Sequence, residues 1–397
     1  MSGTSGPLHI AIDAREAGPK PSGLARYTFN LLRGLARYGA PHRYTVLTNH
    51  PELLADLAAH PAFTLIDPGV RIVDPREQVV LPRLVDRLRP DVFHSTSMVA
   101  PVFLPRGVKR IMTLHDTIPL SFPQGFKAYE RAMWAAYYGL SIRPTVRRTD
   151  RVITVSEWSR QDIVKHLDCS PDRVAVTYNW AEDHFAPPTT ERVAALRARY
   201  GLPARFVLGL GSQYGYKNHD GLLVAFAKLA ARVPDVDLVL KVGRPQRLVA
   251  RLRQLGLERR VRFLGTVADD ELPALYAAAE VFVFPSFYEG FGLPPLEAMR
   301  CGTPVIASTA SSIPEVVGSA ALLCPPHDSD RLAELMELAL GDATLRAELR
   351  ERGLAQSARF NLARGVAETL AVYDEVTGRQ KAPVRPVATT DALVGMV

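Results

Sequence analysis

Short apolar runs alternate with longer amphipathic stretches through the first half of the chain. Residues 23–39 repeat apolar side chains at intervals of three and four, which predicts a helix with one buried face. The short runs lack polar alternation, so they are typical of strands covered on both faces. The strands predicted in this way span residues 8–13, 43–49, 91–95, 109–116 and 151–156. Strands separated by helices indicate a parallel sheet.

The same alternation restarts after a proline-bearing linker at residues 183–191. Further strands are predicted at residues 205–211, 237–243, 261–265, 281–286 and 304–308, and the chain is predicted to be helical from residue 331 onward. We therefore expect an N-terminal domain over residues 1–187 and a C-terminal domain over residues 188–370. A helix at about residues 371–378 is expected to pack back on the first domain. Residues 379–397 lack periodicity, which predicts a flexible tail.

This pattern predicts an α/β protein with two facing, Rossmann-like, doubly wound domains. A length of 397 residues fits two domains of ordinary size. In open parallel sheets, ligands bind outside the carboxyl ends of the strands. The cleft between the two domains is therefore the expected place for a site.

The composition is that of an ordinary globular protein, with 47% hydrophobic and 22% charged residues. No apolar run reaches the roughly 18–20 residues that cross a bilayer, and the N-terminus has no secretory signal pattern. Cys169, Cys301 and Cys324 are far apart and show no paired spacing. These features favour a reducing cytoplasm.

The formal charge of +7 favours anionic partners. Arginines gather in residues 143–151 and 247–260, where arginines at helical spacing most often form a solvated face. The alternative is docking on an anionic membrane surface, which would place the protein on the inner face of the membrane. We expect a phosphorylated ligand and no nucleic-acid partner.

The stretch "FYEGFGLPPLEAM" places two carboxylates, Glu289 and Glu297, around a turn rich in glycine and proline. It follows a predicted strand, and the next helix is expected to begin at about Pro294 or Pro295 because proline fits the first helical turn. Glycines let the backbone approach a ligand closely, and a helix N-terminus suits a phosphate. Carboxylates accept hydrogen bonds from vicinal hydroxyls. The stretch therefore predicts a phosphate site with two acids beside it, which suits a sugar and a ribose.

These two acids are also compatible with different roles. Glu297 is expected in the first helical turn, where a glutamate often compensates the helix dipole. Two carboxylates could also flank a glycosidic bond, as in a glycosidase, but one loop–helix unit does not place them on opposite sides of it. Asp235 and Asp237 open a strand at its amino end, away from the expected site, so they do not indicate a metal. We expect neither a metal nor a cofactor.

Five segments in order resemble the retaining glycosyltransferases of family 4, which have the GT-B fold. The stretch "EGFGLPPLEAMRCGTPVIAS" resembles the E-x7-E signature of that family, with matching spacing of Glu289 and Glu297. "SGLARYTFNLL" resembles its N-terminal glycine loop and helix, "LHDTIPL" its HDxxPL segment, "VSEWSRQDI" its VSxxS segment, and "GSQYGYKN" its phosphate-binding turn. The resemblance covers nearly the whole chain.

The resemblance implies a nucleotide-sugar donor on the C-terminal domain and an acceptor on the N-terminal domain. By position, Glu297 would bind the ribose hydroxyls, and Glu289 would bind hydroxyls of the transferred sugar. Lys217 would neutralise the diphosphate. Backbone N–H groups of three residues would face the distal phosphate and the sugar: Phe291, Gly292 and Leu293.

In the N-terminal half, the resemblance implies that Gly23 lets its loop touch the diphosphate and that His115 lies under the anomeric centre. One position departs from the family pattern, because Ser212 stands where the family often has an arginine. One positive charge is then missing from the donor site. Arg244 or Arg26 is expected to compensate together with Lys217.

The sequence therefore predicts a metal-independent, retaining hexosyltransferase that uses a GDP- or UDP-linked sugar, with mannose favoured. The acceptor is expected to be a glycan or a lipid-linked glycan in polysaccharide biosynthesis, because the chain most resembles bacterial mannosyl- and rhamnosyltransferases. A nucleotide-sugar epimerase or a non-catalytic sugar-nucleotide-binding module would also use two α/β domains, so both remain open.

Overall fold

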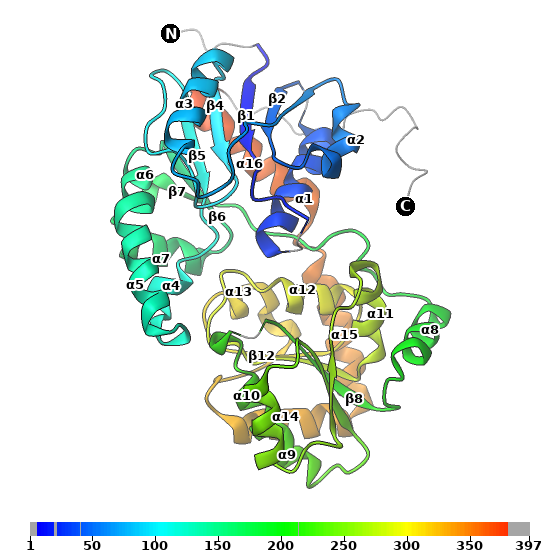
Figure 1. Ribbon diagram of the computed structural model, residues 1–397. Helices are drawn as coiled ribbons and strands as arrows, with labels where there is room; N and C mark the ends of the chain where they lie inside the picture. Colours follow the sequence, from blue (N-terminus) through cyan, green and yellow to red (C-terminus); the bar gives the residue numbers. More distant parts are fainter. Residues whose placement is uncertain (1–5, 20–21, 40, 213, 380–397) are drawn as a thin grey trace. The chain divides into compact units, whose positions relative to one another are not determined.

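The computed structural model describes residues 6–19, 22–39, 41–212 and 214–379, which form two compact units (Figure 1). Within these residues, the first unit comprises Met1–Ser121, Tyr129–Asn179 and Leu362–Val397, and the second comprises Phe122–Ala128 and Trp180–Asn361. The sequence predicted an acceptor-binding domain that ends at residue 187 and a donor-binding domain that ends at residue 370. This assignment of roles to the two domains remains a prediction. Residues 380–397 of the expected flexible tail lie outside the described part.

The first unit contains a parallel sheet of seven strands in the order β3-β2-β1-β4-β5-β6-β7, counted over the described residues. Its strand β1 pairs on both sides, since Ile10 lies opposite Tyr44 of one neighbour and Val92 of the other. The strands are β1 (His9–Asp13), β2 (Arg43–Leu47), β3 (Phe63–Ile66), β4 (Val92–Ser95), β5 (Lys109–Thr113), β6 (Arg151–Thr154) and β7 (Val174–Val176).

The second unit repeats the plan with six parallel strands in the order β10-β9-β8-β11-β12-β13 in the part that the structure covers. The switch point lies between β8 and β11, where the strand order reverses, and ligands of such sheets bind there. The strands are β8 (Phe206–Leu210), β9 (Asp237–Lys241), β10 (Val261–Leu264), β11 (Val281–Phe284), β12 (Val305–Ser308) and β13 (Leu322–Cys324).

Helices connect the strands in both units. The helices of the first unit are α1 (Gly23–Tyr38), α2 (Ala55–Ala58), α3 (Glu77–Leu88), α4 (Ile118–Ser121), α5 (Ala128–Tyr137), α6 (Arg143–Arg147), α7 (Glu157–Leu167) and α16 (Leu362–Thr377), with a π-helical turn η3 at Tyr138–Ile142. Those of the second unit are α8 (Thr190–Tyr200), α9 (His219–Ala230), α10 (Gln246–Gln254), α11 (Leu272–Ala278), α12 (Leu293–Arg300), α13 (Ile313–Val317), α14 (Ser329–Gly341) and α15 (Ala343–Ser357). The α/β class with two Rossmann-like domains is confirmed.

Local sequence fixes where several helices begin. The Ser22 hydroxyl accepts a hydrogen bond from the Ala25 N–H at 3.0 Å, and the Ser156 hydroxyl accepts one from the Ser159 N–H at 3.0 Å. Such caps satisfy N–H groups that the helix leaves without a partner, and each is worth about 1 kcal/mol. These caps fix the starts of α1, which follows β1 in the chain, and of α7, which follows β6.

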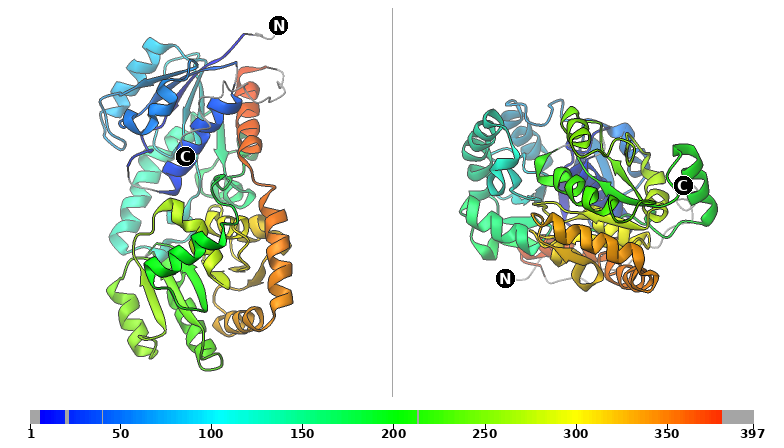
Figure 2. Two further views of the ribbon diagram at one scale, coloured as in Figure 1. Left: turned by 90° about the vertical axis from the view of Figure 1, so that its right-hand side faces the viewer. Right: turned by 90° about the horizontal axis from the view of Figure 1, so that it is seen from below.

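The last helix, α16, returns to the first unit and lies along α1 (Figures 1 and 2). The two helices touch at Gly34, where a side chain would meet Val366 at 2.4 Å and Leu362 at 2.6 Å. The Tyr373 hydroxyl lies 2.8 Å from Nδ1 of the fully buried His94 on β4. The sequence predicted a returning helix at about 371–378, whereas the helix in the structure already begins at Leu362.

Candidate donor and acceptor sites

The loop between β11 and α12 carries the first predicted carboxylate. The helix begins at Leu293, one residue earlier than expected, and Gly292 precedes it with a φ of 117°, a conformation that favours glycine. Because Pro294 and Pro295 have no N–H, the first turn offers few donors. The N–H groups of Gly292 and Leu293 have no protein partner among the described residues. They are the two donors left at this helix end.

Two serines of the neighbouring β12–α13 connection hold this loop. The Glu289 N–H donates to the Ser311 hydroxyl at 2.9 Å. The Ser312 hydroxyl is 2.9 Å from the carbonyl oxygen of Glu289 and 2.7 Å from that of Phe291, and it donates to them. These bonds fix the backbone around Glu289 before any ligand arrives. Neither serine was predicted from the sequence, although their place just after a predicted strand could have indicated them.

Lys217 and Glu289 form an ion pair within the second unit. The Lys217 ammonium lies 2.7 Å from Oε1 and 2.9 Å from Oε2 of Glu289, and their side chains are only 13% and 10% exposed. The ammonium also lies 5.2 Å from the centre of the Tyr216 ring and 5.4 Å from that of Phe284. The structure therefore brings together two of the predicted site residues from opposite sides of the switch point.

The turn that carries Lys217 is fixed by its next residue. Asn218 has a φ of 55°, and its side chain caps α9 by accepting from the Gly221 N–H at 3.2 Å. The same side chain donates to the carbonyl oxygens of Pro285 and Pro326, at 3.0 and 2.7 Å. The bond to Pro285 ties the turn to the end of β11. The sequence places this asparagine within the predicted phosphate-binding turn but did not indicate its structural role.

Unpartnered polar atoms gather around the same turn. His219 donates from Nε2 to the carbonyl oxygen of Ser212 at 3.1 Å, while its Nδ1 has no partner. The hydroxyls of Ser212 and Ser286 are also buried without a partner in the described part of the chain. Burial lowers the pKa of His219 to about 4, so its ring is neutral at pH 7. Buried polar groups are almost always hydrogen-bonded, so these atoms are suited to contact a bound polar ligand.

Glu297 lies in the second turn of α12 and not in the first as expected, because the helix begins at Leu293. Its side chain is buried, and Oε2 accepts a hydrogen bond from the Tyr276 hydroxyl at 2.8 Å. A carboxylate at this position does not cap the helix. Tyr276 on α11 was not predicted, because no sequence pattern around it indicated this contact.

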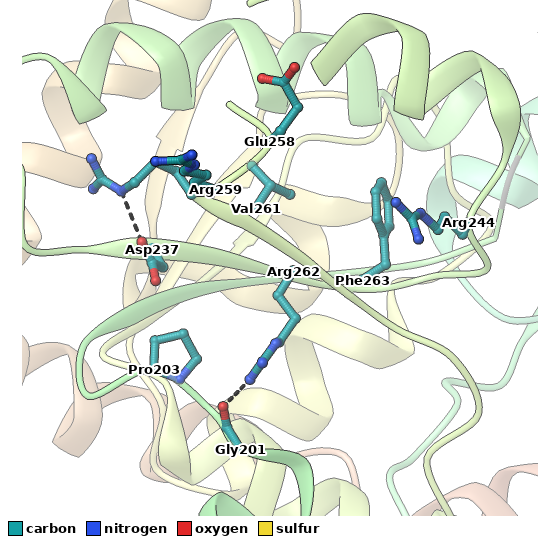
Figure 3. A pocket seen from close by; sticks show the side chains of 10 residues that line it. Gly201, Pro203, Asp237, Arg244, Glu258, Arg259, Val261, Arg262 and Phe263 are labelled. Carbon is teal, nitrogen blue, oxygen red and sulfur yellow. Dashed lines mark hydrogen bonds and ion pairs between the residues drawn. The ribbon is translucent and has the colours of Figure 1, made fainter. Parts of the chain in front are cut away.

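Arg244 lines a separate cavity of about 520 Å³ along β10 (Figure 3). Phe263 lines the same cavity, and the Arg244 side chain makes no hydrogen bond or ion pair with a described residue. Arg262 in the same cavity donates to the carbonyl oxygen of Gly201. The structure gives no contact between Arg244 and Lys217, so compensation for Ser212 stays a prediction. The alternative candidate, Arg26, has partners of its own.

In the first unit, His115 follows β5 and is buried. Its Nε2 donates to the carbonyl oxygen of Thr96 at 3.4 Å, and the ring stands edge-on to Tyr27 with centroids 4.6 Å apart. Burial lowers the pKa of His115 to about 4, so the ring is neutral at pH 7 and its Nδ1 can accept a hydrogen bond. The next residue, Asp116, accepts from the Ile118 N–H at 3.0 Å and so shapes the loop.

Gly23 is the first residue of α1 and is exposed. A side chain built at Gly23 would meet nothing within 4 Å among its neighbours. Packing within the first unit therefore does not explain why this position is a glycine. Close approach of a ligand is one explanation that remains.

One group of side chains within the described residues has the spacing of metal ligands. Ligand atoms of Glu182, His184 and Asp269 all lie within 4.8 Å of one another. His184 lies 3.7 Å from Glu182 and 3.6 Å from Asp269, as expected for a histidine between two acids. None of the three belongs to the loop of Glu289 or the turn of Lys217. The absence of a metal requirement stays a prediction.

The chain matches family models over most of its length. Residues 21–185 match Glycosyltransferase Family 4, and residues 197–356 match Glycosyl transferases group 1. O-antigen chain mannosyltransferase B of Escherichia coli is 33% identical over 331 residues, which are 82% of this chain and 84% of that protein. Serotype-specific mannosyltransferase WbdA of Escherichia coli is 31% identical over 398 residues, 90% of this chain but only 46% of WbdA.

Solved structures show the same fold. The glycosyltransferase WaaG, involved in lipopolysaccharide biosynthesis, aligns with a TM-score of 0.70 at 18% identity over 93% of this chain and 100% of that one. HepE of Anabaena, in complex with UDP and glucose, aligns with a TM-score of 0.70 at 21% identity over 92% and 100%. The two Rossmann-like units and the site at the switch point define a glycosyltransferase of the GT-B class. Within that class, the chain belongs to glycosyltransferase family 4.

Proposed function

We propose that the chain is a retaining mannosyltransferase that moves the sugar of a nucleotide diphosphate donor to a hydroxyl of a glycan or lipid-linked acceptor. The observation that carries the proposal is the part-buried pairing of Lys217 with Glu289. Glu289 belongs to the same loop as Gly292 and Leu293, whose N–H groups have no protein partner in the described part of the chain. This arrangement offers one cation, one carboxylate and two backbone donors within a single loop cluster. In a sugar diphosphate, the phosphates can bind to the cation and the backbone donors, and the sugar hydroxyls can donate to the carboxylate. The two curated relatives above, both named mannosyltransferases, support mannose as the sugar.

In this proposal, Lys217 and the two N–H groups stabilise the negative charge of the leaving diphosphate. Preorganised donors of this kind usually contribute more to the rate enhancement than any other single effect. Glu289 accepts hydrogen bonds from the transferred sugar, and Glu297 accepts them from the ribose. Tyr276 positions Glu297 by donating to its Oε2. Further contacts to the ligand come from the buried polar atoms around the turn of Lys217: the hydroxyls of Ser212 and Ser286 and Nδ1 of His219.

The proposal of transfer with retention is supported by the resemblance to the family. The acceptor hydroxyl attacks the anomeric carbon on the face that the diphosphate leaves, so a new C–O bond forms as the bond to the phosphate oxygen breaks. The departing phosphate takes the proton of that hydroxyl. Neutral His115 contributes a hydrogen bond to the transferred sugar and carries no charge in this scheme. The chain then needs no nucleophile and no metal of its own.

Peripheral docking on an anionic membrane is part of the same proposal. The face of α5 and η3 exposes three large apolar side chains: Tyr129 is 65% exposed, Met133 55% and Leu140 81%. Arg143 and Arg148 are exposed in the residues that follow this face. No described helix is long and apolar enough to cross a membrane. Docking would therefore depend on this apolar face together with the arginines.

The four arginines of residues 143–151 are not equally available for docking. Arg147 already lies 3.6 Å from Asp168, and Arg151 pairs with Glu375 at 2.7 Å. These acidic partners offset the charge of two of the four arginines. Arg143 and Arg148 are therefore the two that carry the charge attraction in this proposal.

A two-stage experiment tests the function. A thermal-shift screen with GDP-, UDP-, ADP- and dTDP-linked sugars identifies the donor, because a ligand at a hundredfold excess over its dissociation constant stabilises the fold by about 2.7 kcal/mol. The stabilising donor is then incubated with mannose oligosaccharides, and the new linkage is read by NMR. An axial α-linkage from an α-linked donor supports retention. Isomerised donor without acceptor would indicate an epimerase, and binding without transfer or hydrolysis would indicate a binding module.

A further inference from the structure

A second cavity lies at the carboxyl ends of the first three strands of the first unit, with a volume of about 900 Å³. Arg15 lies two residues beyond β1, Asn49 two residues beyond β2, and Asp67 directly after β3, and all three line it. Pockets of about 300–1,000 Å³ hold small ligands, and the carboxyl edge of a parallel sheet is where ligands bind.

Arg15 builds one wall of this cavity. Its buried guanidinium is 2.8 Å from both carboxylate oxygens of Asp13 and 3.0 Å from Glu77. It also donates to the carbonyl oxygens of Val70 and Arg71, at 3.4 and 3.1 Å. These bonds engage every nitrogen of the guanidinium and neutralise its charge. Arg15 therefore holds the loop of residues 67–76 in place and is not itself available to a ligand.

The loop is held in an unusual backbone conformation. Val73 has a φ of 66° although it is β-branched, and Gly69 has a φ of 67°. Such strain costs of order 1–3 kcal/mol and persists only where the surroundings enforce it. Asn49 donates to the Asp67 carboxylate at 3.0 Å and to the carbonyl oxygen of Val70 at 3.3 Å. These bonds hold the loop, which forms one side of the cavity, in a fixed conformation.

The polar groups that remain free suit a neutral, hydroxyl-rich ligand. The Arg71 side chain has no hydrogen bond or ion pair with a described residue. Asp74 and Arg76 pair with each other at 2.7 Å, so they offset each other's charge. Asp67 accepts through Oδ1 from Asn49 at 3.0 Å and from the Gly69 N–H at 2.9 Å. Arg71 and the other carboxylate oxygen of Asp67 then remain in the lining, one group of each sign. A balanced set of donors and acceptors does not favour a phosphate or an anionic lipid headgroup. It does favour a sugar ring, whose hydroxyls both donate and accept.

We propose that this cavity binds a sugar residue of the acceptor glycan, with Arg71 and Asp67 as the side chains that contact it. The proposal rests on the proposed function, because it assumes a glycan acceptor, but sugar binding can be measured without any donor. The site would select acceptors through a residue of the glycan and would leave the donor site unchanged.

The test compares Arg71→Ala and Asp67→Asn with the wild type. Arg83→Ala is the matched control, since Arg83 is an exposed arginine of the same unit that does not line the cavity. Saturation-transfer NMR uses methyl glycosides of mannose, glucose, galactose, rhamnose and N-acetylglucosamine, together with α-mannobiose and inorganic phosphate. Thermal melting checks that each variant folds, and calorimetry with GDP and UDP checks the donor site.

We expect at least one glycoside or the disaccharide to bind the wild type and Arg83→Ala, with at least a fivefold loss of signal in Arg71→Ala and Asp67→Asn and unchanged nucleotide affinity. Where transfer is measurable, the acceptor KM should rise at least tenfold in these two variants while the donor KM changes less than twofold. The proposal fails if no sugar of the panel binds the wild type, if the variants bind sugar equally well, or if phosphate alone competes for the site. Sugar binding without transfer from any donor would instead count against the proposed function.

Discussion

The ammonium of Lys217 contacts both carboxylate oxygens of Glu289, at 2.7 and 2.9 Å, in a place where both side chains are nearly out of water. Removing one partner of such a pair leaves a buried charge without compensation and costs roughly 3–5 kcal/mol in comparable buried pairs. A diphosphate that reaches Lys217 supplies a second anion to the same cation. In the proposed function, the pair would therefore couple the charge of the donor to the carboxylate proposed for its sugar.

The first prediction separates the two roles of this pair. Lys217→Met should lower the affinity for the free nucleoside diphosphate by about 1.5–3 kcal/mol, because a charged hydrogen bond is lost. Glu289→Gln should keep or raise that affinity, since the ammonium is no longer shared, while kcat falls at least tenfold. Calorimetry and transfer kinetics measure both. Lys228→Met is the control, because Lys228 pairs with Asp330 at 2.7 Å elsewhere in the unit. Equal affinity in Lys217→Met and the wild type would contradict the diphosphate role.

The second prediction concerns Glu297 and the ribose. The wild type should bind a nucleoside diphosphate more tightly than its 2′,3′-dideoxy analogue, because the hydroxyls donate to Glu297. In Glu297→Ala this preference should disappear, with a loss of roughly 1.5–3 kcal/mol for the ribose form. Tyr276→Phe should reduce the preference by a smaller amount. If Glu297→Ala keeps the full preference in a calorimetric titration, another group binds the ribose.

The third prediction is a pH dependence of stability. Burial lowers the pKa of His115 and of His219 to about 4, below the value of about 6.5 in an unfolded chain. Between pH 4 and 6.5 the unfolded state then binds more protons, so the free energy of unfolding falls as the pH falls, by up to about 1.4 kcal/mol per pH unit for each group. Denaturant titrations of His115→Asn and His219→Asn should show a shallower loss between pH 7 and 5 than the wild type. An unchanged slope in both variants would argue against neutral burial.

The fourth prediction is that transfer persists in EDTA, because Lys217 and the backbone N–H groups of Gly292 and Leu293 are proposed to carry the charge of the diphosphate. The group of Glu182, His184 and Asp269 offers a matched check. His184→Ala should leave kcat within about twofold, a change of less than about 0.5 kcal/mol in the barrier. If EDTA abolishes transfer and added Mg²⁺ or Mn²⁺ restores it, metal independence is refuted. If His184→Ala abolishes transfer without any chelator, the required ion binds at this group.

The fifth prediction concerns membrane docking. Vesicles with anionic lipid should pellet the protein, and recovery should fall steeply with salt because charge attraction is screened within about 8 Å at physiological ionic strength. Leu140→Ser and the double variant Arg143→Gln/Arg148→Gln should each reduce recovery. Arg83→Gln should not, although it also removes an exposed arginine from the first unit. Equal recovery with neutral and anionic vesicles would favour an acceptor in free solution.

The sequence predicted the central strands of both sheets and missed three others: β3, β7 and β13. All three lie at sheet edges, and they are only three or four residues long. An edge strand has a neighbour on one side only and needs no continuous apolar run. The short run around Phe63 therefore did not stand out from its surroundings.

The sequence motifs predicted which two loops form the candidate donor site. The pairing of Lys217 with Glu289 joins two stretches that the sequence had singled out, and the parallel-sheet rule placed both at the same edge. Tyr276 and Ser312 were not predictable, because their roles depend on side chains that meet across different helices and loops. The register of α12 was misjudged because two adjacent prolines suggested a helix start, whereas the conformation of Gly292 fixes it at Leu293.

The close contact of α16 with Gly34 has a consequence for how the protein is made. The first unit receives Tyr373, the partner of the buried His94, only after the whole second unit has been synthesised. At about 5–20 residues per second, that delay is roughly 10–40 seconds on the ribosome. During this time the face of α1 around Gly34 is uncovered and exposed to chaperones or to other nascent chains. Ribosome pausing within residues 180–361 should therefore affect the yield of folded protein more strongly than pausing near the start of the chain.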